Sequence, residues 1–301
     1  AAFITALRMK GETADEICGA ARAMKKKALS FKINTDDTIL DTCGTGGDAC
    51  NTFNISTACA FVAAAGGVKV AKHGNRAVSS KSGSADVLEA LGIKIDLSAE
   101  LVKRCIEEIG IGFLFAPIFH RAMKYASAPR KEIGIRTIFN LLGPLTNPVG
   151  ADVQVLGVFS PELTERIAYV LMKLGIREAM VVSGLDKMDE ISICAVSRIS
   201  HLRNGDIKTF HVSPEDFGIM RCPPDEIEGG GSRDNARIIM DIFSGEKGAK
   251  RDAVLINSAA ALVVSGKAKD LSEGIRLAQE IIDSGLAIKK LNELKEFTHS
   301  L

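Results

Sequence analysis

A stretch of glycines, hydroxyls and amides between residues 41 and 57 has the residue types of a phosphate-binding loop. It reads Asp41-Thr-Cys-Gly-Thr-Gly-Gly-Asp-Ala-Cys-Asn-Thr-Phe-Asn-Ile-Ser-Thr57. Its three glycines allow positive φ angles, so that successive backbone N–H groups can converge on anionic oxygens. A strand-like run precedes the loop, and a helical pattern with Ser56 or Asn54 as its N-cap follows it, which adds a helix N-terminus to the same site. The alternative is a flexible turn, because the loop matches neither the P-loop nor the dinucleotide fingerprint.

A second polar segment carries positive charge. Lys72-His-Gly-Asn-Arg76 leaves a predicted strand at 68–71, and a Ser-rich loop then leads into a helix for which we predict Ser84 as the cap. Lysine and arginine beside a helix N-terminus favour an anionic ligand.

Adjacent carboxylates at Asp189 and Glu190 follow a predicted strand at 180–183. Mg²⁺ is usually held by one or two carboxylates together with substrate phosphates and water. An isolated Asp-Glu pair is more often solvated surface, so the magnesium interpretation depends on the two phosphate-type loops at the same sheet edge.

Arg130 follows Pro129, which we predict at the first position of a new helix. Its guanidinium could grip a carboxylate in two places, although a surface arginine is the simpler interpretation. His73 and His120 could contact a ligand or be structural. We find no pattern typical of a nucleophilic triad.

Composition limits the possible partners. The chain has 301 residues, with 38 Lys plus Arg against 37 Asp plus Glu, so no global field favours nucleic acid or a membrane surface. Its seven cysteines include no Cys-x-x-Cys pair, which argues against a disulfide framework or zinc site and for the reducing cytoplasm. No signal peptide or bilayer-spanning run is recognisable.

The periodicity predicts an α/β fold, with helices on both faces of a mostly parallel sheet. Helices are expected at 2–9, 13–29, 56–65, 85–91, 98–109 and 162–174, and from 232 to the end. Strands are expected at 38–41, 68–71, 112–116, 153–159 and 179–182, with a hairpin at 190–212 that turns at Asn204-Gly. Ligands of such sheets bind where strands end, which is where the polar loops lie.

Several of these segments together resemble the anthranilate phosphoribosyltransferase family along the whole chain. The segments are Gly44-Thr-Gly-Gly-Asp48, Asn54-Ile-Ser-Thr57, Lys72-His-Gly-Asn-Arg-Ala-Val-Ser79, Ser82-Gly-Ser-Ala-Asp-Val-Leu-Glu-Ala-Leu-Gly92, Arg130, Asn140-Leu-Leu-Gly-Pro-Leu-Thr-Asn-Pro148 and Asp189-Glu190.

The resemblance implies a small all-helical domain, 1–33 plus 98–123, hinged to a large α/β domain, 34–97 plus 124–301. It implies transfer of a 5-phosphoribosyl group from phosphoribosyl pyrophosphate to the amine of anthranilate, which is the second step of tryptophan biosynthesis from chorismate, with Mg²⁺ as cofactor. It also implies a homodimer whose contact involves helices that precede Ala1 in the family, so the printed chain lacks part of that contact.

The resemblance further implies residue roles. Catalysis is assigned to Lys72, Asn75 and Arg130, and Mg²⁺ binding to Ser56, Asp189 and Glu190. The donor-binding residues are Gly44, Gly47, Asp48, Thr52, Asn54, Ile55, Ser56, Thr57, Lys72, His73, Gly74, Asn75, Arg76, Ala77, Val78, Ser79, Ser80 and Ser84. The acceptor-binding residues are Asn75, Arg130, His73, His120, Gly143 and Pro144.

Two alternatives remain from the residues. One is a non-catalytic relative of the same fold that binds nucleic acid, which would show a basic surface. The other is a pyrimidine nucleoside phosphorylase. The Lys-His-Gly-Asn-Arg segment and the Asp189-Glu190 pair favour the transferase.

Overall fold

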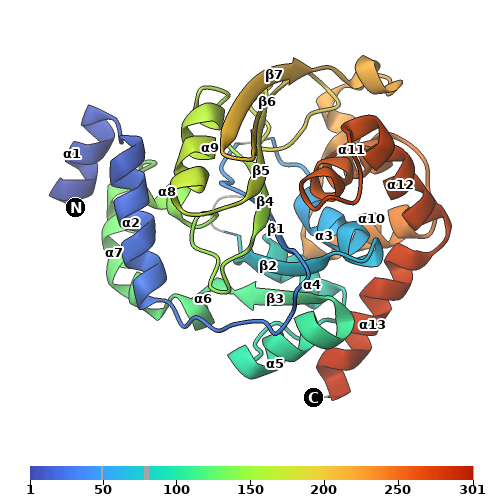
Figure 1. Cartoon of the computed structure of the whole chain (residues 1–301), viewed down its shortest axis with the longest axis horizontal. Helices are drawn as coiled ribbons and strands as arrows, with labels where there is room; N and C mark the ends of the chain where they lie inside the picture. Colours follow the sequence, from blue (N-terminus) through green and yellow to red (C-terminus); the bar gives the residue numbers. More distant parts are fainter. Residues whose placement is uncertain (49, 78–80, 301) are drawn as a thin grey trace.

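A single seven-stranded sheet organises the part of the chain that the computed structural model describes, residues 1–48, 50–77 and 81–300. Its strand order is β3-β2-β1-β4-β5-β6-β7 (Figure 1). The first five are parallel, and the last two continue the sheet antiparallel. The strands are β1 (Ile39–Gly44), β2 (Lys69–Gly74), β3 (Ile111–Phe115), β4 (Val153–Gly157), β5 (Glu178–Gly184), β6 (Ser197–Arg203) and β7 (Asp206–Val212). The expected mostly parallel sheet is therefore confirmed.

Helices cover both faces of this sheet. The α-helices are α1 (Ala2–Lys10), α2 (Ala14–Lys27), α3 (Ile55–Ala65), α4 (Ser84–Ala90), α5 (Ala99–Arg104), α6 (Ala116–Phe119), α7 (Lys124–Ile133), α8 (Phe139–Leu142), α9 (Leu163–Lys173), α10 (Ser232–Phe243), α11 (Ala249–Val264), α12 (Leu271–Asp283) and α13 (Leu286–Ser300). A π-helical turn, η1 (Cys105–Ile109), extends α5, and short 3₁₀ turns are η2 (Arg121–Met123), η3 (Pro214–Phe217) and η4 (Pro224–Ile227). In Figure 1, α2, α8 and α9 lie to one side of the central strands, and α3 and α10 to α13 lie to the other.

Two hydrophobic cores result from the alternation of side chains along the strands. On β5, Met180 and Val182 face the core shared with α3 and α11, whereas Ala179 and Val181 face the core shared with α2 and α9. This is the period of two that a strand covered on both faces requires. Helix α3 is buried almost all round, which explains its run of small apolar residues.

Local sequence signals set several boundaries. Thr13 and Glu16 form the expected capping box at the start of α2. The β6–β7 hairpin turns at Asn204 and Gly205, both with positive φ (53° and 76°), as a tight hairpin turn requires.

Two local predictions were wrong. Pro129 does not open a helix but lies inside α7, where it removes only one backbone N–H from the helix's hydrogen bonding. Ser84 is the first helical residue of α4 rather than its cap, which is Gly83. The Asp86 carboxylate supplies the capping contact by accepting from the N–H of Gly83 at 2.8 Å.

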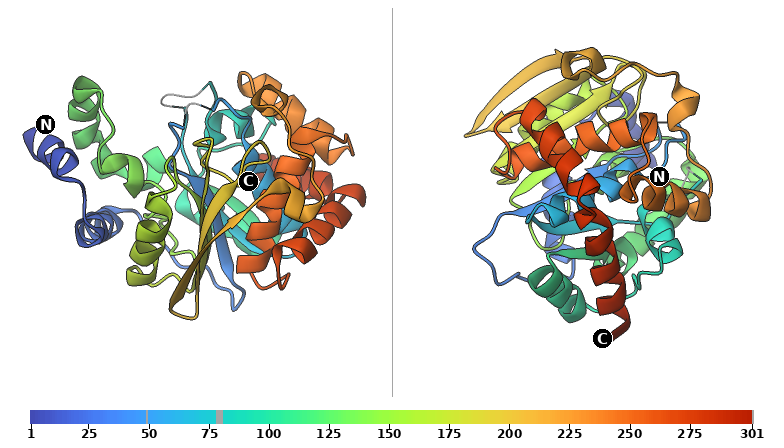
Figure 2. Two further views of the ribbon diagram at one scale, coloured as in Figure 1. Left: turned by 90° about the horizontal axis from the view of Figure 1, so that it is seen from above. Right: turned by 90° about the vertical axis from the view of Figure 1, so that its right-hand side faces the viewer.

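Helices α1, α2 and α7 lie together at one end of the molecule (Figure 2). The division into domains 1–33 plus 98–123 and 34–97 plus 124–301 stays a prediction. One part of its small domain is not helical, because residues 111–115 form β3 and pair with β2. Helix α5 packs on that strand and on η1.

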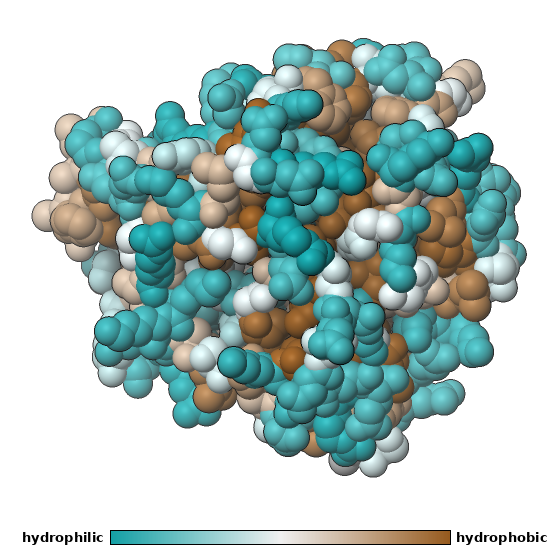
Figure 3. Space-filling model, in the orientation of Figure 1, coloured by the Kyte–Doolittle hydropathy of each residue, from teal (hydrophilic) through white to brown (hydrophobic). Residues whose placement is uncertain are grey.

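The N-terminal helix exposes apolar side chains. Phe3 is 75% exposed and Met9 is 84% exposed, and the pale brown colour at the N-terminal end in Figure 3 marks this region. No helix in the described ranges has both the length and the apolar character needed to cross a lipid bilayer.

A glycine lies at the end of each of the strands β1 and β4 and leaves space there for a neighbouring loop. Gly44 and Gly157 are register partners. A Cβ atom on Gly157 would overlap the backbone oxygen of Asp189, and one on Gly44 would overlap its carboxylate. The missing side chains therefore let the loop after β5 lie directly on the strand ends.

Gly157→Ala should displace that loop, because backbone atoms of Asp189 would have to move. We expect the free energy of unfolding to fall by roughly 1–3 kcal/mol in urea denaturation. Gly19→Ala is the control, since Gly19 lies in α2 with open space around its Cα, and it should stabilise by roughly 0.5–1 kcal/mol. Equal stability of Gly157→Ala and the unsubstituted protein would refute the close approach.

Candidate active site

The glycine loop, residues 45–54, is held against the loop that follows β5. The backbone N–H of Gly46 donates to Asp189 Oδ2 at 2.7 Å. The N–H of Thr45 donates to the carbonyl of Gly157 at 2.9 Å. Gly46 and Gly47 have positive φ (64° and 72°), a conformation that glycine adopts readily and other residues rarely do.

Asp48 braces the same two loops. Its carboxylate accepts from the N–H of Cys50 at 3.3 Å and from the N–H of Asp189 at 3.4 Å. These are the contacts of a side chain that shapes its own loop, and they explain how a negative charge is accommodated in a loop that we predict to bind an anion.

The predicted metal ligands lie close together. Glu190 Oε1 accepts from the backbone N–H of Ser56 at 3.3 Å, while its Oε2 is buried and has no hydrogen-bond partner. Burial, followed by the charge of Asp48, raises the pKa of Asp189 to about 7. Burial and the charge of Asp189 raise the pKa of Glu190 well above its usual range. Ser56, Asp189 and Glu190 all line one small cavity.

These residues fit a hard divalent cation. Two crowded carboxylates and an orphaned buried oxygen are disfavoured without a positive partner, and oxygen ligands are those that Mg²⁺ takes. In the described part of the chain, no three His, Cys, Asp or Glu side chains form a group that could hold a metal by themselves. The pair therefore suits a metal that completes its shell with hydroxyl, water and substrate oxygens.

Lys72 supplies a buried positive charge next to this pair. It is 3% exposed, and its Nζ donates to the carbonyl of Thr42 at 2.6 Å and to Ser56 Oγ at 3.3 Å. Burial lowers its pKa, while the charges of Asp41 and Glu190 act against that shift. Lys72 thus touches one predicted metal ligand directly.

Asp41 on β1 forms hydrogen bonds to β2 and to the loop before β4. No role was predicted for this residue from the sequence. It is fully buried and accepts from the N–H of His73 at 3.2 Å and from Asn147 Nδ2 at 2.9 Å. Asn147 also donates to the carbonyl of Ala71 at 2.8 Å. Burial raises the pKa of Asp41 to about 6, against these hydrogen bonds and the charge of Lys72. An aspartate within an apolar strand sequence was the available signal.

His73 and His120 form a second group on the other side of β2. Their ring centroids are 5.0 Å apart, and both are buried with an unpartnered Nε2. Burial lowers the pKa of His73 to about 3, against a hydrogen bond with the backbone of Gly143, and burial also lowers the pKa of His120. The structure therefore brings the neutral rings of His73 and His120 together, each with an unpartnered Nε2, and His73 also contacts the backbone of Gly143. Pro144, next to them, accepts from Gln154 Nε2 at 2.7 Å.

The loop after β2 turns back onto α4. The carbonyl of Asn75 accepts from Ser84 Oγ at 3.4 Å, and the Asn75 side chain accepts from the N–H of Arg76 at 2.8 Å. The Arg76 guanidinium binds Asp86 and Glu89, so its charge is already paired. The N–H of Ala77 donates to Asp86 at 2.9 Å. Gly74 is tightly enclosed, since an added Cβ would overlap Ser84 Oγ.

Of the predicted donor residues around α3, some make backbone or side-chain hydrogen bonds and others are buried in the core. Asn54 caps the helix without a side-chain cap bond and instead donates to the carbonyl of Ser82 at 3.1 Å. Thr52 forms an isolated bridge with Glu228. Ile55 and Thr57 are buried in the core, and Thr57 Oγ1 has no partner. Val78, Ser79 and Ser80, also predicted to bind the donor, lie outside the described residues.

Arg130 is half-buried on α7, with its guanidinium 5.3 Å from the ring centroid of Phe139. Burial lowers its pKa. Arg136, six residues later, was missed by the sequence reasoning. Its guanidinium lies 4.4 Å from the centroid of Phe159 and donates to the carbonyl of Gly47, which ties the segment after α7 to the glycine loop. Nothing local in the sequence marks this contact, because its partner is distant along the chain.

The chain has the two parts of a glycosyltransferase family. The family model described as "Glycosyl transferase family, a/b domain" matches residues 36–288, and that described as "Glycosyl transferase family, helical bundle domain" matches residues 1–28.

More specific relatives agree. The anthranilate phosphoribosyltransferase of Acetivibrio thermocellus is 60% identical over 298 residues, which cover 99% of this chain and 86% of that protein. A crystal structure of the Thermus thermophilus enzyme has a TM-score of 0.92 at 44% identity, covering 98% of this chain and 88% of that one. The Saccharomyces cerevisiae enzyme in complex with PRPP and Mg has a TM-score of 0.91 at 34% identity, covering 99% and 84%, and it is also known with 4-fluoroanthranilate. The chain belongs to the anthranilate phosphoribosyltransferase family.

Mg²⁺ together with inorganic pyrophosphate should raise the thermal unfolding midpoint, because both bind only the folded site. Glu190→Gln should lose most of this rise while remaining at least as stable as the unsubstituted protein without ligands, since it removes a buried carboxyl group whose Oε2 has no hydrogen-bond partner. The rise should be larger at about pH 8 than at about pH 6, because Asp189, whose pKa is raised to about 7, would bind the metal in its deprotonated form. Differential scanning fluorimetry measures all three.

Glu226→Gln, on an exposed part of η4, is the control and should leave the rise unchanged. If Glu190→Gln responds like this control, Glu190 is not a metal ligand.

Proposed function

We propose that this protein transfers the 5-phosphoribosyl group of phosphoribosyl pyrophosphate to the amine of anthranilate and releases pyrophosphate, the second step of tryptophan biosynthesis from chorismate. The 60% identity to a relative of that name supports this reaction, as does the likeness to a yeast enzyme solved with PRPP and Mg. The homodimer implied by the resemblance stays a prediction.

The proposal rests on two neighbouring residues of β2 that face opposite sides of the sheet. Lys72 and His73 are consecutive on β2, so their side chains point to opposite faces of the strand. Lys72 reaches Ser56 on the side of the glycine loop and the carboxylate pair. His73 meets His120 on the other side. Two chemically different half-sites, one for an anion with its metal and one for an aromatic molecule, thus meet at one strand end.

The donor half-site fits a pyrophosphate. The glycine-loop amides, the N-terminus of α3 and Lys72 are positive or hydrogen-donating groups around the position where a leaving anion would gain charge. We assign donor binding to the residues of the glycine loop, the α3 N-terminus and the loop after β2. When bound through Ser56, Asp189 and Glu190, Mg²⁺ would neutralise pyrophosphate charge.

The acceptor half-site fits anthranilate. Its aromatic amine is uncharged at neutral pH and needs no strong base before it attacks C1 of the ribose. The C1–N bond forms as the C1–O bond to pyrophosphate breaks, and the nitrogen then loses a proton. The neutral rings of His73 and His120 suit an aromatic ring, Asn75 would orient the amine, and Arg130 would face the carboxylate.

The reaction is tested by following anthranilate fluorescence in the presence of phosphoribosyl pyrophosphate and Mg²⁺. We expect the fluorescence to fall, and to stay constant when either the donor or Mg²⁺ is omitted. Phosphorolysis of a pyrimidine nucleoside without anthranilate turnover would instead assign the phosphorylase reaction.

Arg130→Ala should raise the anthranilate KM about tenfold or more and leave the donor KM nearly unchanged, because a charge-assisted pair contributes about 1.5–3 kcal/mol. Arg136→Ala is the matched control on the same segment. It frees the carbonyl of Gly47 and should raise the donor KM instead. Steady-state kinetics against each substrate distinguish the two, and equal effects on both substrates for Arg130→Ala would contradict its role.

A further inference from the structure

Two thiols lie in contact close to the loop after β5, which carries Asp189 and Glu190. Cys194 Sγ and Cys222 Sγ are 3.5 Å apart. Cys194 follows the Asp189-Glu190 pair by a few residues, and Cys222 lies between η3 and η4. The backbone holds the two segments together, because the N–H of Cys222 donates to the carbonyl of Ile193 at 3.2 Å.

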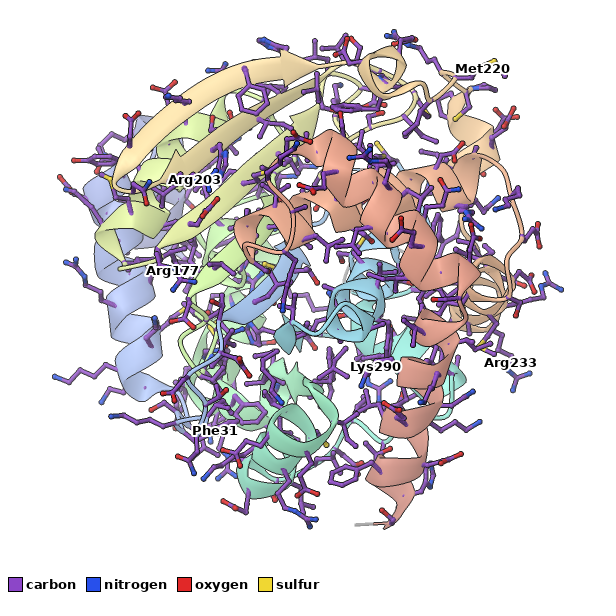
Figure 4. All side chains as sticks on the ribbon, turned by 45° about the vertical axis from the view of Figure 1, so that its right-hand side comes forward. Phe31, Arg177, Arg203, Met220, Arg233 and Lys290 are labelled. Atoms are coloured by element: carbon purple, nitrogen blue, oxygen red, sulfur yellow. The ribbon has the colours of Figure 1, made fainter. Side chains whose placement is uncertain are left out.

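The pair is placed where a reagent can reach it. Both residues are partly exposed, whereas Cys18, Cys59 and Cys105 are buried. The segment that carries Cys222 runs along the surface, where its neighbour Met220 is 87% exposed and is labelled at the edge of the molecule in Figure 4.

We propose that Cys194 and Cys222 are a redox modification site. They form a reversible disulfide with each other by exchange with low-molecular-weight disulfides such as oxidised glutathione. One protein thiolate attacks a glutathione sulfur, which breaks the glutathione disulfide and releases one glutathione thiol. The second cysteine then attacks the resulting mixed disulfide. The protein S–S bond forms, the second glutathione leaves as a thiol, and the two protein thiol protons pass to the two glutathione sulfurs.

The geometry demands little movement. A disulfide needs an S–S distance of about 2.0 Å, so the sulfurs must approach by roughly 1.5 Å. Both cysteines lie outside regular helices and strands, where such a shift disturbs no ladder of hydrogen bonds.

The thiols are not primed for other chemistry. Burial, with the hydrogen bond to Cys222, raises the pKa of Cys194 to about 12, and burial raises the pKa of Cys222. Thiolates react and thiols do not, so exchange should be slow and should require sustained oxidising conditions. Contact between the two sulfurs then favours closure over further reaction with glutathione.

The disulfide would link the end of the loop after β5 to the segment after β7. It would join two cysteines separated by 28 positions in the sequence, and such a link limits the unfolded chain more than the folded one. The oxidised protein should therefore be the more heat-stable form.

The test is to equilibrate the full chain with rising ratios of oxidised to reduced glutathione, trap free thiols by alkylation and map the peptides by mass spectrometry. We expect a peptide pair that links Cys194 to Cys222, released by dithiothreitol, and a thermal midpoint that rises by a few degrees on oxidation. Cys194→Ser and Cys222→Ser should each abolish the link and the rise, and should retain a glutathione adduct on the remaining cysteine.

Cys50→Ser is the matched control, since Cys50 is also partly exposed and lies near Asp186 in the same region. It should leave the link intact. The proposal is overturned if the pair stays unlinked at the most oxidising ratio, or if Cys194 links to Cys50 instead.

Discussion

The close approach of the loop after β5 to the ends of β1 and β4 is the contact on which the site depends. Only glycine at positions 44 and 157 leaves room for the backbone and carboxylate of Asp189. That approach delivers a hydrogen bond from Gly46 to Asp189 and places Glu190 at the N-terminus of α3. Two loops distant in the sequence thereby become the two walls of one site.

The approach also creates an electrostatic problem, because it buries carboxylates near one another. Burial first, and then the charges of the neighbouring carboxylates, raise the pKa values of Asp189 and Glu190. Lys72 offsets part of the charge through its position among Asp41, Ser56 and Glu190, while its own pKa is lowered by burial. A divalent cation bound through the same carboxylates would offset the remaining negative charge. The folded chain therefore favours binding of a metal together with an anionic substrate.

The sequence predicted much of this arrangement for physical reasons. The glycine loop, the Asp189-Glu190 pair and the Asn204-Gly205 turn are local signals, because each depends on a few neighbouring residues with special backbone or charge. Asp41 and Arg136 could not be found in the same way, since their roles depend on Asn147, His73 and Gly47, which lie far along the chain. Ser84 was misplaced because the Asp86 carboxylate supplies the capping contact to Gly83. Pro129 was misplaced because α7 begins at Lys124 and continues through it. The substrate roles of the site residues came from the family resemblance, and only the spatial grouping of those residues came from the structure.

We expect Ser56, Asp189 and Glu190 to hold the metal that accompanies the donor. A crystal of the protein with phosphoribosyl pyrophosphate and Mn²⁺ in place of Mg²⁺ tests it directly through the anomalous signal of manganese. We expect a manganese peak within about 2.0–2.5 Å of an oxygen of Glu190 or Asp189, with the donor pyrophosphate on its other side. Manganese bound to pyrophosphate but remote from both carboxylates would contradict it.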